Sequence, residues 1–216
     1  MILTDSNGRE ATPHSILNHV PVGDRDKFDV RVVPVYTTEE AFYRVGNGDV
    51  DVNNAIVIVD VLTNDVRGTR QRQAASPEDL VWRVDQLRGR LKQAGASTSV
   101  ICQIKPMEVA DVTAHNAHLD NYLRAQGGPG YGCRTQVRRN FLKRDGFHVS
   151  PQFDSIIDRT YACAMLGWPV PNPTPLEDFA PEFARRRYDA EWPSMVRRTG
   201  WNQGVGHQGP RNIHGW

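Results

Sequence analysis

Three short segments of the chain carry side chains of the kinds that act together in nucleophilic catalysis. Ser6 follows Asp5 directly after the opening "MILT", "TND" occupies positions 63–65, and Asp145 precedes His148 by three residues. A serine hydroxyl is a weak nucleophile until a base takes its proton, a histidine can be that base near neutral pH, and a carboxylate can fix the histidine tautomer. The chain therefore contains the parts of a serine nucleophile site, spread over most of its length.

These segments act together only if the fold brings them to one place. Apolar runs predict strands at 1–4, 28–35, 53–62 and 97–104. Helical spacing and capping signals predict helices at 15–20, 37–45, 76–95, 109–128 and 152–166. This alternation predicts an α/β fold, a three-layer α/β/α sandwich with a parallel sheet. We expect that sheet to be flavodoxin-like and five-stranded, and the apolar runs locate four of its strands. Because the carboxyl ends of parallel strands share one edge, we expect the three segments to converge there.

Taken in order, the segments resemble a known family. "DSN" at 5–7, "TND" at 63–65 and "DGFH" at 145–148 are similar to the first, third and fifth sequence blocks of the SGNH hydrolases, also called GDSL esterases and lipases. The resemblance covers roughly residues 1–167. It implies a serine esterase with Ser6 as nucleophile, His148 as general base and then acid, and Asp145 as the group that orients His148.

The resemblance also implies an oxyanion hole made by the backbone N–H of Ser6 and the side-chain amide of Asn64. One such donor is commonly worth about 3 kcal/mol in the transition state. Asp5 and Asp65 are expected to support these residues rather than to react. The chain has Tyr36 or Thr37 where the second block of the family has glycine, and Thr4 and Leu62 also replace block glycines.

Two finer resemblances concern the last block. "FLKRDGFHVSPQF" and "LTND" are similar to segments of the esterase-like domains of LINE-type retrotransposons. A more distant cousin is the domain of the germ-plasm protein Oskar, which keeps the fold, lacks the catalytic residues and binds RNA. Since Ser6, Asn64, Asp145 and His148 are all present in this chain, the resemblance favours an enzyme.

Each candidate residue also has an ordinary structural interpretation. Ser6 alone is a good helix N-cap, and the other two blocks are what favour catalysis. Lys105, at the end of a predicted strand, could contact a substrate anion, although such a lysine is more often solvated. His115 and His118 stand at helical spacing without a third ligand nearby, so we expect no metal and no other cofactor.

Composition bounds the class of protein. A net charge of +1 gives no overall field for nucleic acid or an anionic membrane, and no apolar stretch approaches the length of a membrane span. Cys102, Cys133 and Cys163 are widely spaced and odd in number, which favours a reducing, intracellular or cytoplasmic location. Separate buried thiols are favoured over a Cys133–Cys163 contact.

The C-terminal part has a different composition. We expect an SGNH-hydrolase-like domain at 1–168 and a Pro/Gly/Arg/Trp-rich extension at 169–216, whose last 36 positions hold six Arg against three acidic residues. Arginine interleaved with planar aromatics suits stacking on unpaired RNA bases. A disordered or partly docked extension is the other interpretation. The candidate RNA-binding residues are Arg185, Arg186, Arg187, Trp192, Arg197, Arg198 and Trp201.

The sequence thus supports two hypotheses. The first is a serine esterase that cleaves a carboxylic ester, acyl or acetyl, of a small substrate through an acyl-enzyme on Ser6. The second is a non-catalytic RNA-binding module of the same fold. The basic residues of "RRNFLKR" at 138–144 are a solvated face or attract anionic substrates or RNA.

Overall fold

The computed structural model describes most of the first 167 residues. The described residues are 1–68, 72–105, 107, 112–126, 141–151 and 154–167, together with the backbone of 132–133. The predicted extension at 169–216 lies outside them. Within the described part, no helix is long and apolar enough to cross a membrane.

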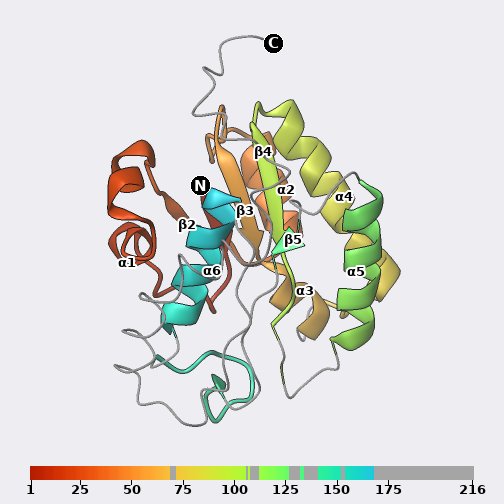
Figure 1. Cartoon of the computed structure of the whole chain (residues 1–216). Helices are drawn as coiled ribbons and strands as arrows, with labels where there is room; N and C mark the ends of the chain where they lie inside the picture. The colour runs from red at the N-terminus through yellow and green to blue at the C-terminus, as the bar shows by residue number, and fades with distance from the viewer. Residues whose placement is uncertain are drawn as a thin grey trace. The chain divides into compact units, whose positions relative to one another are not determined.

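Five parallel strands form one sheet in the order β2-β1-β3-β4-β5 (Figure 1). The strands are β1 (Ile2–Thr4), β2 (Val32–Pro34), β3 (Ile56–Asp60), β4 (Thr98–Cys102) and β5 (Gly132–Cys133). Ile58 is the register partner of Ile2 on β1 and of Val100 on β4, so β3 is the central strand. The order and the parallel pairing confirm the predicted flavodoxin-like sheet.

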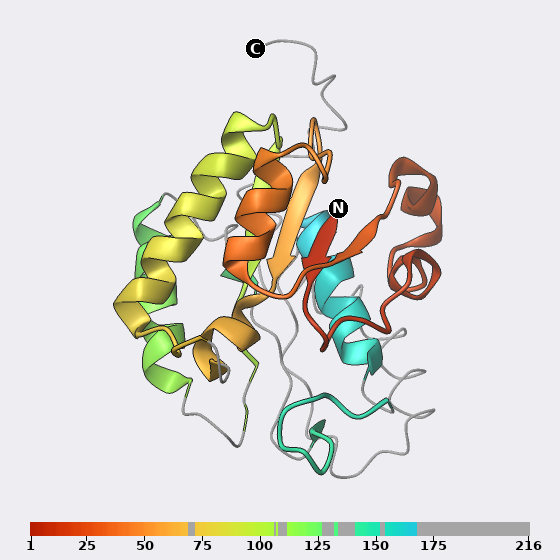
Figure 2. The same cartoon turned by 180° about the vertical axis from the view of Figure 1, so that it is seen from behind.

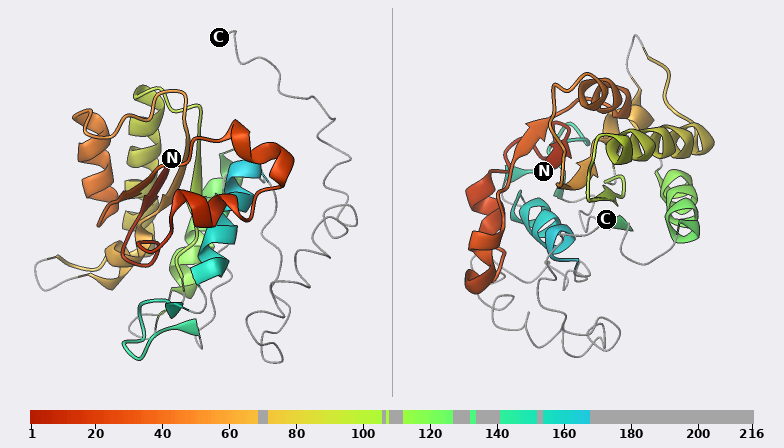
Figure 3. Two further views of the ribbon diagram at one scale, coloured as in Figure 1. Left: turned by 90° about the vertical axis from the view of Figure 1, so that its left-hand side faces the viewer. Right: turned by 90° about the horizontal axis from the view of Figure 1, so that it is seen from above.

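Helices cover both faces of this sheet. They are α1 (Pro13–Leu17), α2 (Thr38–Gly46), α3 (Leu62–Arg67), α4 (Pro77–Gln93), α5 (Thr113–Ala125) and α6 (Asp154–Leu166), with a 3₁₀ helix at Val22–Lys27. Figure 3 shows α1 and α6 on one side of the sheet and α2 and α4 on the other, where α5 packs against α4. These are the three layers that the sequence predicted.

The core forms where the apolar stripe of α4 meets the sheet. Leu80, Val84, Leu87 and Leu91 recur at helical spacing and are completely buried, as is most of β3. The helix begins at a capping box between Ser76 and Asp79, with Pro77 at its first position. A strand buried on both faces needs a helix on each side, which accounts for the position of α4.

Three elements differ from the sequence prediction. The first helix begins at Pro13, with Thr12 as its N-cap and Ser15 completing a capping box, rather than at Ser15. The "TND" segment lies within the short helix α3 instead of in a strand-end loop. The fifth strand, β5, is two residues long and lies in a stretch predicted as loop.

Candidate active site

The segment 141–151 carries His148 and lies at the end of the sheet to which the β3 arrow points (Figure 2). Its two arms pair through an antiparallel bridge between Leu142 and Val149, and the Ser150 N–H donates to the Phe141 carbonyl at 2.8 Å. Gly146 has φ +65°, a conformation that favours glycine and turns the chain back between the arms. We call this segment the His148 hairpin.

The turn after β1 carries Ser6 on the same edge. Asp5 is buried, and its Oδ1 accepts the Asn7 N–H at 2.8 Å, while the Gly8 N–H donates to the Asp5 carbonyl at 3.2 Å. Ser6 is exposed at the top of this turn. The interpretation of Ser6 as a helix cap is wrong, because α1 begins at Pro13 with Thr12 as its cap.

Ser6, His148 and Asp145 form a continuous hydrogen-bonded chain. The Nε2 atom of His148 lies 3.0 Å from the Ser6 Oγ, and the Nδ1 atom lies 2.8 Å from the Asp145 Oδ2. The other carboxylate oxygen of Asp145 accepts the backbone N–H groups of Phe147 and His148, each at 2.9 Å. This arrangement can transfer the serine proton to the imidazole.

Hydrogen bonding keeps Asp145 ionised. The His148 side chain, followed by the His148 backbone N–H, lowers the pKa of Asp145 to about 2. The carboxylate is therefore charged at any pH near neutrality. Because Asp145 accepts from Nδ1, it favours the tautomer that leaves Nε2 free to receive the Ser6 proton.

Asn64 lies beside the second sequence block. Its Nδ2 donates to the Tyr36 carbonyl at 2.9 Å, which engages one of its two amide hydrogens. The Tyr36 N–H donates to Glu40, whereas the backbone N–H groups of Ser6 and Thr37 form no hydrogen bond among the described residues. The candidate oxyanion donors are therefore the N–H groups of Ser6 and Thr37 and the second hydrogen of the Asn64 amide.

Asp65 joins α3 to α2 and α4. Its carboxylate accepts the N–H and the hydroxyl of Thr38, at 2.9 and 3.0 Å, and pairs with the Arg83 Nη1 at 2.8 Å. Burial raises the pKa of Asp65, and the hydrogen bonds from Thr38 and Arg83 oppose that rise. These contacts fix the orientation of α3, which carries Asn64.

A buried polar network lies beneath the Ser6 turn. The Lys105 Nζ pairs with the Asp60 Oδ2 at 2.5 Å, the Tyr161 hydroxyl donates to the same oxygen at 2.6 Å, and the Thr4 hydroxyl lies 2.9 Å from that of Tyr161. Burial lowers the pKa of Lys105, but the carboxylates of Asp60 and Asp5 outweigh it and raise that pKa. The expectation that Lys105 is solvated or contacts a substrate anion is wrong, because its side chain is buried and paired.

Asp5 is the residue of this region whose ionised form is disfavoured by its surroundings. Burial raises the pKa of Asp5 to about 6, the nearby Lys105 opposes the rise and Asp60 adds to it. Its Oδ2 has no hydrogen-bond partner among the described residues. Two buried carboxylates therefore share one ammonium group, and at neutral pH the neutral form of Asp5 is unusually accessible.

Sequence analysis missed Asn7, Asp60 and Tyr161. The sequence patterns place Tyr161 only within the predicted helix at 152–166 and Asp60 only within the predicted strand at 53–62. A carboxylate within an apolar run such as "AIVIVDVL" is itself a signal, since a fully buried acid needs a partner. No sequence signal links Asp60 to Lys105 or Tyr161, which the fold brings together across 45 and 101 positions.

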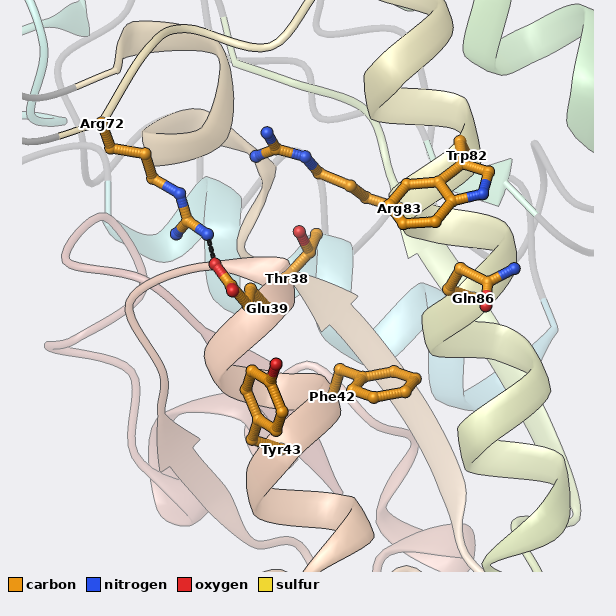
Figure 4. A pocket seen from close by; sticks show the side chains of 8 residues that line it. All are labelled: Thr38, Glu39, Phe42, Tyr43, Arg72, Trp82, Arg83 and Gln86. Carbon is orange, nitrogen blue, oxygen red and sulfur yellow. Dashed lines mark ion pairs between the residues drawn. The ribbon is translucent and has the colours of Figure 1, made fainter.

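A cavity of about 270 Å³ lies between α2 and α4 (Figure 4). Phe42 and Tyr43 line it from α2, and Trp82 from α4; the Tyr43 and Trp82 side chains are largely exposed. Its two arginines are neutralised, because Arg72 pairs with Glu39 and Arg83 with Asp65. The cavity is thus aromatic and nearly neutral. Asp65 of α3 contacts two of its lining residues, Thr38 and Arg83.

The structure describes most of the remaining histidine and cysteine candidates. His115 bonds to the Ala75 carbonyl at 2.9 Å and His118 lies 3.5 Å from Glu78. Among the described residues no group of three His, Cys, Asp or Glu could hold a metal ion. Cys102 and Cys163 are free and buried, while the side chain of Cys133 is outside the description.

The candidate RNA-binding residues lie outside the described part of the chain, so the binding of RNA by the 169–216 extension stays a prediction. The finer resemblance to retrotransposon esterase domains and to Oskar also stays a prediction. Single-stranded RNA affinity that falls steeply with salt, measured with and without residues 181–216, tests that prediction.

Comparison with known proteins adds a relationship at the level of the fold. The sequence matches no protein-family model. It also matches no curated protein sequence. Among solved structures, the chain is similar to a GDSL-like lipase from Bacteroides thetaiotaomicron, with a TM-score of 0.55, 14% identity, and coverage of 76% of this chain and 86% of the lipase. The chain therefore has the α/β fold of a GDSL-like lipase.

Proposed function

We propose that the protein is a serine esterase of the SGNH type, which hydrolyses a carboxylic ester of a small substrate through an acyl-enzyme on Ser6. The observation that carries the proposal is the hydrogen-bonded chain from the Ser6 Oγ through both ring nitrogens of His148 to Asp145. The lipase-like fold supports it, because the same sheet edge carries all three residues.

In the acylation step, the Ser6 Oγ attacks the ester carbonyl carbon while the His148 Nε2 takes the hydroxyl proton. Negative charge develops on the carbonyl oxygen. The donors available to it are the Asn64 amide and the N–H groups of Ser6 and Thr37, which form no hydrogen bond to the described residues. Asp145 stabilises the imidazolium that forms. The intermediate then collapses, the C–O bond to the alcohol breaks, and His148 returns the proton to the leaving oxygen.

In the deacylation step, a water molecule attacks the acyl carbon and gives a proton to the His148 Nε2. The bond to the Ser6 Oγ breaks, His148 returns the proton to that oxygen, and the carboxylic acid leaves. The site is open to water, because Ser6 is exposed and the His148 and Asp145 side chains are 34% and 47% exposed. This exposure suits hydrolysis, in which water must reach the acyl carbon.

Replacing Ser6 by Ala tests the proposal. We expect the initial rate on para-nitrophenyl acetate and butanoate to fall at least about 10³-fold, the usual effect of removing a serine nucleophile. Ser97→Ala is the matched control, since Ser97 is exposed just before β4 at the opposite edge of the sheet. A fluorophosphonate probe should label wild type and Ser97→Ala but not Ser6→Ala. Equal turnover by Ser6→Ala and wild type would overturn the mechanism.

A further inference from the structure

Arg67 provides an unneutralised positive charge beside the candidate site. It is exposed at the end of α3, and within the described part of the chain it forms no ion pair. Arg72 and Arg83, which flank the cavity between α2 and α4, are both paired with carboxylates. Since a guanidinium stays charged near neutral pH and offers five N–H donors, Arg67 is available to an anion.

The Arg67 guanidinium and the imidazole of the candidate base contact the same aromatic ring. Its central carbon lies 4.2 Å from the centroid of the Phe147 ring. The same ring meets the His148 imidazole edge-on, with the centroids 4.8 Å apart. Phe147 is only 2% exposed, so its ring is a fixed support. Packing over an aromatic face orients a guanidinium and leaves its N–H edges free for a ligand.

Arg67 is also tied to the candidate oxyanion donors. It follows Asn64 by three residues on α3, and residues three apart lie on the same face of a helix. Arg67 therefore lies on the same helix face as Asn64, and it contacts the Phe147 ring that also contacts His148. A basic residue in the last turn also interacts favourably with the helix dipole, but that interaction requires no aromatic ring beneath the guanidinium.

Two further cations lie on the His148 hairpin. Lys143 and Arg144 are exposed on the His148 hairpin and carry the same sign as Arg67. The acid of that hairpin, Asp145, is already engaged by the imidazole and by two backbone N–H groups. Lys143 lies near Asp154, where it opposes the rise that burial causes in the pKa of that carboxyl, so Arg67 is the cation on which the inference rests.

We propose that Arg67 is a specificity-determining residue, which makes the site prefer esters carrying a carboxylate or phosphate group close to the scissile bond. The inference rests on the proposed esterase function and narrows its substrate class. Arg67 takes no part in bond making or breaking; it pairs with the anionic group of the bound ester. Neutral esters of the same size lack that pairing and so bind less well.

The test compares kcat/KM on matched ester pairs that differ by one negative charge. Mono-para-nitrophenyl succinate against para-nitrophenyl butanoate places the charge on the acyl side. Para-acetoxybenzoate against its methyl ester places it on the alcohol side. Para-acetoxyphenyl methyl phosphate, a monoanion, against the neutral para-acetoxyphenyl dimethyl phosphate replaces carboxylate by phosphate. Dividing by the neutral partner removes any general effect of a substitution on the site.

We expect Arg67→Gln to lower the anionic-to-neutral ratio about fivefold for at least one pair, the effect of one partly exposed ion pair. Added salt should reduce the wild-type preference. Arg31→Gln is the control, because it removes the same charge just before β2, at the opposite edge of the sheet, and should leave the ratio unchanged.

The outcomes separate the two proposals. If wild type and Arg67→Gln turn over neutral esters and share the same anionic-to-neutral ratio for every pair, the role of Arg67 is wrong and the esterase proposal stands. If wild type hydrolyses no ester and Ser6 takes up no fluorophosphonate, the esterase proposal fails, and the role of Arg67 fails with it.

Discussion

The Val149 N–H donates a hydrogen bond to the Oδ1 of Asn7 at 3.1 Å, immediately beside the contact between Ser6 and His148. Asn7 follows the candidate nucleophile in sequence, and Val149 follows the candidate base. Among the described residues, these two hydrogen bonds join the Ser6 turn to the His148 hairpin. Asn7 is buried, so its hydrogen bond is protected from competition by water. It therefore sets the separation of the two reacting groups.

Replacing Asn7 by Leu removes this acceptor while keeping a side chain in the buried space. We expect kcat on a para-nitrophenyl ester to fall about ten- to a hundredfold with little change in KM, because small misplacements of reacting groups carry large rate penalties. The exposed Asn47→Ala variant is the control. A kcat for Asn7→Leu within about twofold of wild type would show that the hairpin is positioned without Asn7.

Asp145→Asn tests the orientation of His148. The amide lacks the charge that stabilises the imidazolium, and its NH2 group can donate to Nδ1 and so favour the wrong tautomer; we therefore expect kcat to fall about 10²- to 10⁴-fold. Since the pair is largely exposed, the unfolding free energy should change by less than about 1 kcal/mol in urea titration. A loss of stability that matches the loss of activity would instead make Asp145 a structural residue.

The direction of the pKa shift of Asp145 determines how the pair formed by Asp145 and His148 depends on pH. The pKa of Asp145 is lowered to about 2, so its stabilising charge is present above the ordinary carboxyl range and is lost only as the pH falls through about 2. We therefore expect wild-type kcat/KM to show no ionisation of Asp145 between pH 4 and 9. Carboxyl titration followed by NMR checks the pKa directly.

Asp5 gives the opposite pH dependence. Its pKa is raised to about 6, so the neutral carboxyl stabilises the fold at low pH, and that contribution is lost as the pH rises through about 6. Asp5→Asn keeps an acceptor for the Asn7 N–H and removes the charge. We expect the free energy of unfolding of the variant to exceed that of wild type by about 1–3 kcal/mol at pH 8, and to differ little from it at pH 4.

The exposed Asp26→Asn variant is the control for Asp5→Asn, and its effect should be small at both pH values. Urea unfolding at the two pH values gives the free energy of unfolding of wild type, Asp5→Asn and Asp26→Asn. An Asp5→Asn variant that is less stable than wild type at pH 8 would show that the ionised carboxylate is needed next to Lys105.

Gly8 allows the Ser6 turn to lie against the buried network. A Cβ at this position would overlap the Thr4 hydroxyl oxygen and the Tyr161 hydroxyl. We expect Gly8→Ala to lower the unfolding free energy by about 1–3 kcal/mol, the usual effect of overpacking. Gly23→Ala, where a Cβ meets nothing within 4 Å, is the control and should be nearly neutral. Thermal unfolding that is equal for the two variants would contradict the close packing.

Regular patterns in the sequence were sufficient for the fold. The capping box at Ser76, the stripe from Leu80 to Leu91 and the apolar run before Asp60 each report local structure and burial, and they predicted α4 and the central strand. β5 could not be predicted in this way, because a two-residue strand has no period and exists only through its pairing with β4.

The site was predictable to the extent that it depends on blocks of adjacent residues. Ser6, Asn64, Asp145 and His148 lie in three short motifs, and the parallel sheet brings those motifs to one edge. The buried pair of Asp60 and Lys105 and the link from Asn7 to Val149 depend instead on distances between elements, which a pattern of residue types does not contain. Thr12 and Pro13 did carry a readable helix-start signal that was overlooked.

Ser6 and His148 are separated by 142 positions along the chain, and this separation has a consequence for folding. Contacts this distant in sequence form only after the intervening loop has been closed, at an entropic cost that local elements such as α4 do not carry. Closing that loop is favoured by the hydrophobic side chains of the His148 hairpin, because Phe141, Phe147 and Val149 are all buried. When the protein refolds from denaturant, esterase activity is therefore expected to return no earlier than the helical signal in far-ultraviolet circular dichroism.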